Sequence, residues 1–522
     1  MSGPSNAGGG TGGTVTGSKT GITFVVMCAA LMALVDITIV NVALNDIRAS
    51  FGTPINQIGW VSTGYMMANI VIIPMTGWFQ RRFGFRRYLA GSIILFTAAS
   101  ALCGLSWNLP SLVLFRALQG LGGGAIIPTA QTILFARYPK EQHGMAGGLF
   151  GLGAVTGPLL GPTIGGYLID WSTWHWCFLV NVPLGILVAI LALRFIQEPG
   201  FTPSKQKVDI FGIALLASGM ASLQYVLEEG NREGWFESTT ITVLMGIAAT
   251  SLITFVVHQL ETEHPIVDLR IFKNVTYASG TGINLLMGLA LFSGNFLFAL
   301  FCGSVLHYSA LDIGKVFLVS GAFQIVLMPL VGRFGGKADQ RVLLALGIIG
   351  VAISLWMNAH LTERSGFTDL VASMFVRSVS LAFVFIPISV IALSDISPAK
   401  RGNATGLFNL TRELGGSIGT AWMGLLIDRA TKMHTTYLSE YVTPYNPLAQ
   451  EQYAAIQGSV ATQTAAPQMV PETMLALKVK LQALVLSFQD GFTSATVVFL
   501  ASLFLVLLLK KPKSAAGAAG AH

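Results

Sequence analysis

Long apolar runs separated by short polar segments dominate this sequence and leave few folds open to it. Hydrophobic residues make up 53% of the 522 residues and charged residues only 11%, whereas a soluble protein is about 25% charged. Because about 20 consecutive apolar residues span a bilayer as a helix, we predict an all-α, multi-pass membrane protein. Fourteen spans are predicted, at 21–44, 58–78, 88–107, 110–136, 144–169, 176–196, 209–227, 240–260, 275–301, 314–332, 342–359, 369–393, 402–428 and 487–509.

The distribution of Lys and Arg predicts the orientation of these spans. Twenty lie on the side of the N-terminus, whereas the short loops of the opposite side hold only Arg48, Arg232 and Arg364. Cytoplasmic loops are the positively charged ones, so both termini are expected in the cytoplasm. The net charge of +7 then reflects topology, and no nucleic-acid partner is expected. Residues 1–20 are predicted to be a disordered cytoplasmic tail, and 429–486 is the one long outer loop.

Paired features at a nearly constant spacing indicate that the chain repeats itself. Such a repeat predicts two six-helix bundles, 21–196 and 263–522, with two inserted transmembrane helices in 197–262. The spacings are 255, 261 and 258 residues, for Gly77 and Gly332, Arg116 and Arg377, and Gly157 and Gly415 respectively.

The fifth span carries a regular series of glycines, Gly153, Gly157, Gly161 and Gly165. At a spacing of four residues they share one helix face, where another backbone can approach closely. Pro158 removes a backbone donor and bends the helix. The pattern therefore predicts a smooth, kinked helix suited to rocking against a neighbour; ordinary close packing of membrane helices is the alternative.

Two charged residues lie within apolar spans, Asp36 in the first and Arg116 in the fourth. A charge at the middle of a span costs about 2.5–3.5 kcal/mol, so each should face the protein interior and have partners. Burial disfavours the charged form of a carboxylate, so Asp36 is the first candidate for proton exchange. A purely structural role, hydrogen bonding between helices, is the alternative for both residues.

Further polar residues of the spans are candidates for the same machinery. Arg412 and Glu413 in the thirteenth span are additional proton-coupling candidates. As neighbours in sequence they point about 100° apart and need not pair with each other. A central cavity between the halves is predicted to be lined by Thr38, Asn41, Gln119 and Arg377.

Two of these patterns resemble motifs of the major facilitator superfamily. The run from Gly153 to Gly165 and Gly166, with Pro158, resembles the antiporter motif found in exporters of that superfamily. The segment after the second span resembles its cytoplasmic latch, although Gln80 stands where an acidic residue is usual. The latch residues that match are Gly77, Arg81, Gly84, Arg86 and Arg87.

Longer stretches resemble one branch of that superfamily, the fourteen-helix drug:proton antiporters of the EmrB family. They are LVDITIVNVAL around Asp36, WHWCFLVNVPLG, HPIVDLRIF and the outer loop with YVTPYNPLAQEQYAAIQG. The resemblance implies proton-coupled efflux of hydrophobic compounds across a bacterial inner membrane, with a proton-transfer role for Arg116. It also implies two partners, an EmrA-like periplasmic adaptor and a TolC-like outer-membrane channel.

No cofactor is expected, because the sequence lacks a phosphate-binding GxxxxGK[ST] loop and its eight histidines are dispersed, without the spacing of a metal site. The proton gradient is the predicted energy source. Two other classes stay open at this point. One is a proton-coupled uptake symporter of the same superfamily, and the other is a membrane enzyme or channel, for which no catalytic constellation or selectivity filter is visible.

Overall fold

The computed structural model describes residues 15–139, 142–204, 207–334, 338–443, 445–462 and 471–509, and these form helices joined by short connections. Predictions made for residues 1–14, for 463–470 and for Lys140, Lys205, Lys337, Lys510, Lys511 and Lys513 lie outside the described residues. The helices are α1 (Lys19–Phe51), α2 (Ile55–Ile58), α3 (Trp60–Gly104), α4 (Leu109–Arg137), α5 (His143–Trp171), α6 (Trp176–Leu179), α7 (Asn181–Phe195), α8 (Ile210–Glu229), η2 (Trp235–Glu237), α9 (Thr239–Glu261), η3 (Leu269–Lys273), α10 (Val275–Ser304), α11 (Ala310–Phe334), α12 (Gln340–Asn358), α13 (Phe367–Ser394), η5 (Pro398–Lys400), α14 (Arg401–Glu440), α15 (Pro447–Thr462) and α16 (Pro471–Leu507).

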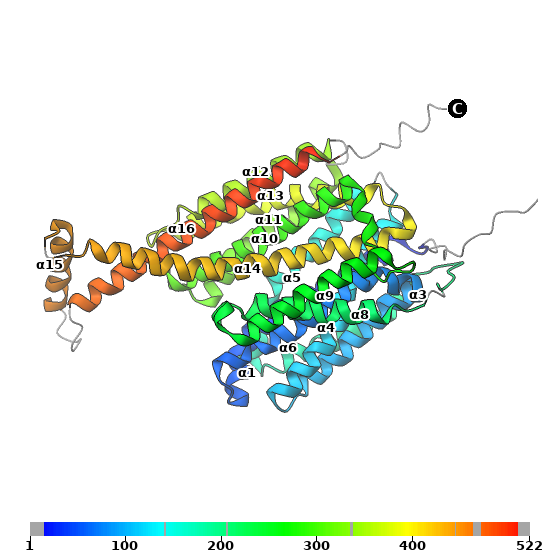
Figure 1. Ribbon diagram of the computed structural model, residues 1–522, viewed down its shortest axis with the longest axis horizontal. Coiled ribbons are helices and arrows are strands. Elements are labelled where there is room, and N and C mark those ends of the chain that lie inside the picture. Colours follow the sequence, from blue (N-terminus) through cyan, green and yellow to red (C-terminus); the bar gives the residue numbers. More distant parts are fainter. Residues whose placement is uncertain are drawn as a thin grey trace, which may run out of the picture.

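The helices pack as two groups with a helical pair beside them (Figure 1). In the first group, which we call the N-half, α1 packs on α4, α5 and α7, and α3 packs on α4 and α7. In the C-half, α10 packs on α13, α14 and α16, and α12 packs on α13 and α16. The inserted helices α8 and α9 pack on each other, and α8 also contacts α3 and α14. Helices of the two groups also contact each other, α5 with α11 and α13, and α3 with α14, and the predicted domain boundaries stay a prediction.

Eleven helices of the described chain are long and apolar enough to cross a membrane. One of them, α3, contains two predicted spans, which are separated by a turn of the backbone at Gly84. Gly84 has φ 80° and ψ 162°, a conformation that is essentially restricted to glycine. The helices α5 and α14 match the two other predicted spans but are outside that set. For α14 the reason is that Arg412 and Glu413 lower its hydropathy, and α5 includes side chains that are not described.

The predicted outer loop 429–486 is largely helical. The helix α14 continues to Glu440, α15 follows, and α16 begins at Pro471, so these elements project beyond the other helices at one end of the molecule (Figure 1). Polar contacts join the two long helices: Thr431 donates to Ser487 at 3.1 Å, and His434 lies 2.7 Å from Asp490. High hydropathy marks only the part of a helix that lies in the membrane. The helices α14 and α16 continue beyond that part as polar segments, and for this reason the sequence predicted a loop.

The last residues of the predicted disordered tail are ordered. The backbone N–H of Thr16 donates to the carbonyl of Gln197 at 2.9 Å, and that of Gln197 donates back at 3.2 Å. Ser18 then caps α1 by accepting from the N–H of Gly21. Gly, Ser and Thr content alone does not reveal this pairing, because its partner lies about 180 residues away in the sequence.

The two halves contact each other closely at the end of the molecule where α1 begins. A Cβ at Gly332 would lie 2.8 Å from the carbonyl oxygen of Gly144, and a Cβ at Gly148 would lie 2.9 Å from that of Met328. Deeper in the molecule, Asn409 of α14 donates to Gln131 of α4 at 2.7 Å. The structure is therefore closed between the two halves at the end where α1 begins.

Candidate functional site

A buried polar network centred on Asp36 occupies the interior of the N-half. One carboxylate oxygen of Asp36 lies 2.7 Å from Nη1 of Arg116. The other accepts hydrogen bonds of 2.8 Å from Gln119 and from Asn181. Asp36 and Gln119 are 0% exposed and Arg116 1%. The structure thus brings together three residues predicted as separate features of spans one and four, in a region closed to solvent.

Further contacts hold Arg116 in place. Its Nε donates to the carbonyl of Val61 at 3.1 Å, and Nη1 also donates to Gln119 at 2.7 Å. The ring of Tyr65 lies 4.3 Å from the guanidinium carbon, a cation–π contact. A buried guanidinium with this many partners meets the requirement for a charge at membrane depth.

Sequence reasoning missed two members of this network, Asn181 and Tyr65. Asn181 begins α7, donates to Asp36 and also donates to Ser100 at 3.2 Å. Both are uncharged residues in otherwise apolar spans, so they stand out less than Asp36 and Arg116. The only signal for Asn181 was its position within WHWCFLVNVPLG, one of the stretches that carried the family resemblance.

The C-half contains a related arrangement that lacks the carboxylate. Arg377 donates to the side chain of Asn295 and, at 3.1 Å, to the carbonyl of Leu291. Asn295 follows Asp36 by 259 residues, within the range of spacings that relates the two halves. Asparagine therefore occupies the repeat position of the aspartate, and a titratable carboxylate is present there in the N-half alone.

Arg412 and Glu413 lie in the first third of α14 and form a long ion contact, 3.7 Å from Nη2 to Oε1. Arg412 also donates to Asn409 at 3.0 Å, the residue that bonds to Gln131 in the other half. The side chain of Glu413 is 23% exposed. It is thus more accessible than Asp36, and its role in proton coupling stays a prediction.

The four residues predicted to line a cavity differ in their exposure to solvent. Asn41 is exposed and accepts from Ser62 at 3.2 Å. The hydroxyl of Thr38 donates to the carbonyl of Val35 at 3.1 Å. Gln119 and Arg377 are buried within the networks described above, so in this conformation neither is accessible, and their substrate role also stays a prediction.

The glycine series of α5 faces α1 of the same half. A Cβ at Gly157 would contact Leu34, one at Gly161 would contact Thr38, and one at Gly165 would lie 2.9 Å from Ile39. Gly153 has more room, 3.7 Å from the carbonyl of Met27, and Gly166 faces open space. The side chain of Pro158 lies outside the described residues.

The latch segment contacts the C-half through Gly77 and Gln80. A Cβ at Gly77 would lie 2.6 Å from the Cα of Asn403 at the start of α14. Gln80 is buried, donates to Thr129 at 3.2 Å, and its amide oxygen fills the space beside Gly402. The neutral Gln80 therefore packs against the first turn of α14, and among the described residues its buried amide oxygen has no hydrogen-bond partner.

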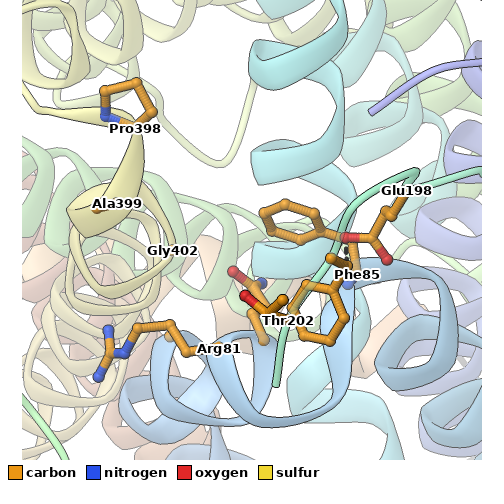
Figure 2. A pocket seen from close by; sticks show the side chains of 10 residues that line it. Arg81, Phe85, Glu198, Thr202, Pro398, Ala399 and Gly402 are labelled. Atoms are coloured by element: carbon orange, nitrogen blue, oxygen red, sulfur yellow. Dashed lines mark hydrogen bonds between the residues drawn. The ribbon is translucent and has the colours of Figure 1, made fainter. Parts of the chain in front are cut away.

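An acidic residue absent from the prediction, Glu198, contacts this segment from another element. It accepts from the backbone N–H groups of Phe85 at 3.0 Å and Arg86 at 2.9 Å, just after the turn at Gly84. Figure 2 shows Glu198 beside Phe85, with Arg81 nearer to Gly402 of the other half. Arg86 and Arg87 are exposed at this end, as expected of residues that set topology.

This fold and this buried charge network define a multi-pass membrane transporter. Residues 26–420 match the model of the Major Facilitator Superfamily. The chain is 33% identical over 494 residues to the multidrug export protein EmrB of Haemophilus influenzae, covering 94% of this chain and 96% of that protein. It is 30% identical over 495 residues to the fatty acid resistance protein FarB of Neisseria gonorrhoeae, covering 95% and 96%. The chain belongs to the Major Facilitator Superfamily, as an EmrB-like member.

Solved structures of other transporters share the fold. The human organic anion transporter MFSD10 superposes with a TM-score of 0.61 at 13% identity, over 94% of this chain and 100% of that one. The proton:xylose symporter XylE superposes with a TM-score of 0.59 at 13% identity, over 92% and 94%. The predicted all-α major facilitator fold is confirmed, and the class is that of a transporter.

Proposed function

We propose that the protein exports hydrophobic small molecules across a bacterial inner membrane in exchange for protons. The observation that carries this proposal is the Asp36 network, in which one carboxylate is buried with Arg116, Gln119 and Asn181. A carboxylate in such a site exchanges a proton only when the surrounding helices move. Its protonation is therefore linked to the conformation of the N-half, which is what coupled transport requires.

The packing of α5 supports a mechanical link between this network and the other half. On one side, Gly157, Gly161 and Gly165 face α1, the helix that carries Asp36. On the other side, Gly144 and Gly148 face α11 of the C-half. A change at Asp36 that shifts α1 would therefore be transmitted through α5 to the contact between the halves.

The names of the relatives favour export, and the projecting elements favour a larger assembly. The outer ends of α14 and α16, together with α15, extend beyond the helices that can cross the membrane (Figure 1). We infer that this extension lies in the periplasm and binds an EmrA-like adaptor, which leads to a TolC-like channel. An extension of this size is not needed to carry a substrate across the bilayer itself.

Reconstitution tests this function directly. Purified protein in proteoliposomes, with a pH gradient imposed, is expected to transport the cation ethidium and the anion dodecanoate against their concentration gradients. Movement of substrate opposite to that of protons supports antiport. Movement in the same direction as protons would indicate an uptake symporter instead, and gradient-independent movement would contradict proton coupling.

A further inference from the structure

The inserted helix α8 contacts both halves at the end of the molecule opposite the closed one. Glu229 accepts from Thr63 of α3 at 3.3 Å and pairs with Arg232 at 2.6 Å. In the loop that follows, Asn231 donates to the carbonyl of Ala421 on α14 at 2.9 Å. The inserted pair α8 and α9 is therefore part of the region where the N-half and the C-half meet.

One face of α8 carries polar residues whose hydrogen-bonding groups do not all have partners. The amide nitrogen of Gln224 donates to Glu228 at 2.9 Å and to Ser417 of α14 at 3.0 Å. The amide oxygen of Gln224 is buried without a hydrogen-bond partner, and the whole side chain is only 2% exposed. A buried acceptor without a hydrogen bond destabilises the site, so a donor supplied from outside the chain would stabilise it.

Glu228 differs from its neighbour Glu229 in its partners. Glu229 is neutralised by Arg232, whereas among the described residues Glu228 has no cation within ion-pair distance. Glu228 is an exposed residue of α8, next to the buried side chain of Gln224 that donates to it. An uncompensated carboxylate beside an unpaired amide oxygen favours a ligand with both a positive charge and N–H donors.

We propose that Gln224, Glu228 and Ser417 form a subsite for the cationic nitrogen group of an exported substrate. The positive charge of the substrate lies against Glu228, and an N–H group of the substrate donates to the free amide oxygen of Gln224. Ser417 orients that amide from the C-half, so the subsite forms only while α8 and α14 are in contact. This proposal rests on the proposed export function and names one class of its substrates, cations with N–H donors.

The test compares two probes of opposite charge in proteoliposomes, ethidium and dodecanoate. Glu228→Gln is expected to lower the ratio of ethidium to dodecanoate transport at least tenfold, and Gln224→Met, which removes the acceptor, about threefold or more. Ethidium binding to the purified protein without a gradient, followed by fluorescence, should weaken by similar factors. Glu237→Gln, in the exposed turn after α8, is the matched control and should leave both probes unaffected.

The outcomes separate this subsite from the proposed function. Unchanged ethidium transport and binding in both variants would overturn the subsite while leaving export intact. An equal loss of ethidium and dodecanoate would also overturn it, since that result indicates a structural or proton-coupling role for Glu228. Wild-type protein that transports neither probe would contradict the export function and the subsite together.

Discussion

The carboxylate of Asp36 lies 2.7 Å from the guanidinium of Arg116, and both side chains are closed to solvent. In the C-half, the arginine at the corresponding repeat position, Arg377, contacts Asn295 instead. The two halves thus share a buried arginine but differ in its partner. Because asparagine does not titrate in the physiological range, this asymmetry makes Asp36 the first position at which to test proton coupling.

Asp36→Asn should abolish transport driven by a pH gradient while substrate binding is retained. The amide preserves the shape of the side chain and removes its titration. It also leaves Arg116 without a counter-charge, and breaking a buried ion pair costs about 3–5 kcal/mol, so a lower melting temperature is expected as well. Transport in proteoliposomes and ethidium binding to the purified variant are the measurements.

The control for this variant is Asp46→Asn, which makes the same change at an exposed position of α1. It should transport at the wild-type rate. Full gradient-driven transport by Asp36→Asn would place the proton site elsewhere, and Glu413 would then be the next candidate.

Glu413→Gln should reduce gradient-driven transport less than Asp36→Asn, or change the range of substrates. Its side chain is 23% exposed and its contact with Arg412 is long, 3.7 Å, so removing the charge disturbs fewer partners. Initial rates for several substrates, measured in the same vesicles, give the comparison. A complete loss of proton-coupled transport of every substrate in Glu413→Gln would show that Glu413 matters at least as much as Asp36.

Gly157→Leu should impair export without preventing expression. A side chain at Gly157 would contact Leu34 of α1, because a Cβ added at Gly157 would lie 3.1 Å from the carbonyl carbon of Leu34. Overpacking of this kind costs about 1–3 kcal/mol. Gly166→Leu is the matched control, since a Cβ there has no neighbour within 4 Å. Equal efflux rates for the two variants, at equal protein levels, would show that the glycine face does not govern transport.

The sequence predicted the helices and the charged residues of the site better than the uncharged residues that contact them. Apolar runs and the repeat were sufficient for the span positions, and the cost of an intramembrane charge singled out Asp36 and Arg116. The pairing of these two side chains depends on how α1 and α4 pack, which no local pattern determines. Asn181 and Tyr65 were missed because uncharged polar residues are tolerated in membrane helices for many structural reasons.

Other differences arose where a contact joins distant parts of the chain. The role of Glu198 at the turn after Gly84 depends on a contact across more than 110 residues. The outer segment was predicted as a loop because hydropathy detects membrane spans and not the water-exposed continuations of α14 and α16. In each case the missing information was tertiary and not local.

Gly84→Ala should destabilise the protein at the turn between the two spans of α3. Gly84 has φ 80° and ψ 162°, and a Cβ there would lie 2.8 Å from the carboxylate of Glu198. A side chain in this backbone region costs about 1–3 kcal/mol, and displacing Glu198 would also remove its two hydrogen bonds. Melting temperatures in detergent are the measurement. Gly91→Ala, in open space on the same helix, should match the wild type, and equal melting of both variants would contradict the assigned strain.

Replacing residues 441–470 by a short Gly/Ser linker should abolish drug resistance in cells while transport in proteoliposomes survives. The replacement removes α15 but keeps the Thr431–Ser487 and His434–Asp490 contacts that join α14 to α16, so the transmembrane helices should still fold. Cells need the extension if it binds the adaptor, whereas vesicles contain no adaptor. Resistance assays, vesicle transport and co-purification with an EmrA-like adaptor are the three measurements. Resistance that persists in cells would exclude docking through this extension, and a loss of vesicle transport would assign the extension to the transport cycle itself.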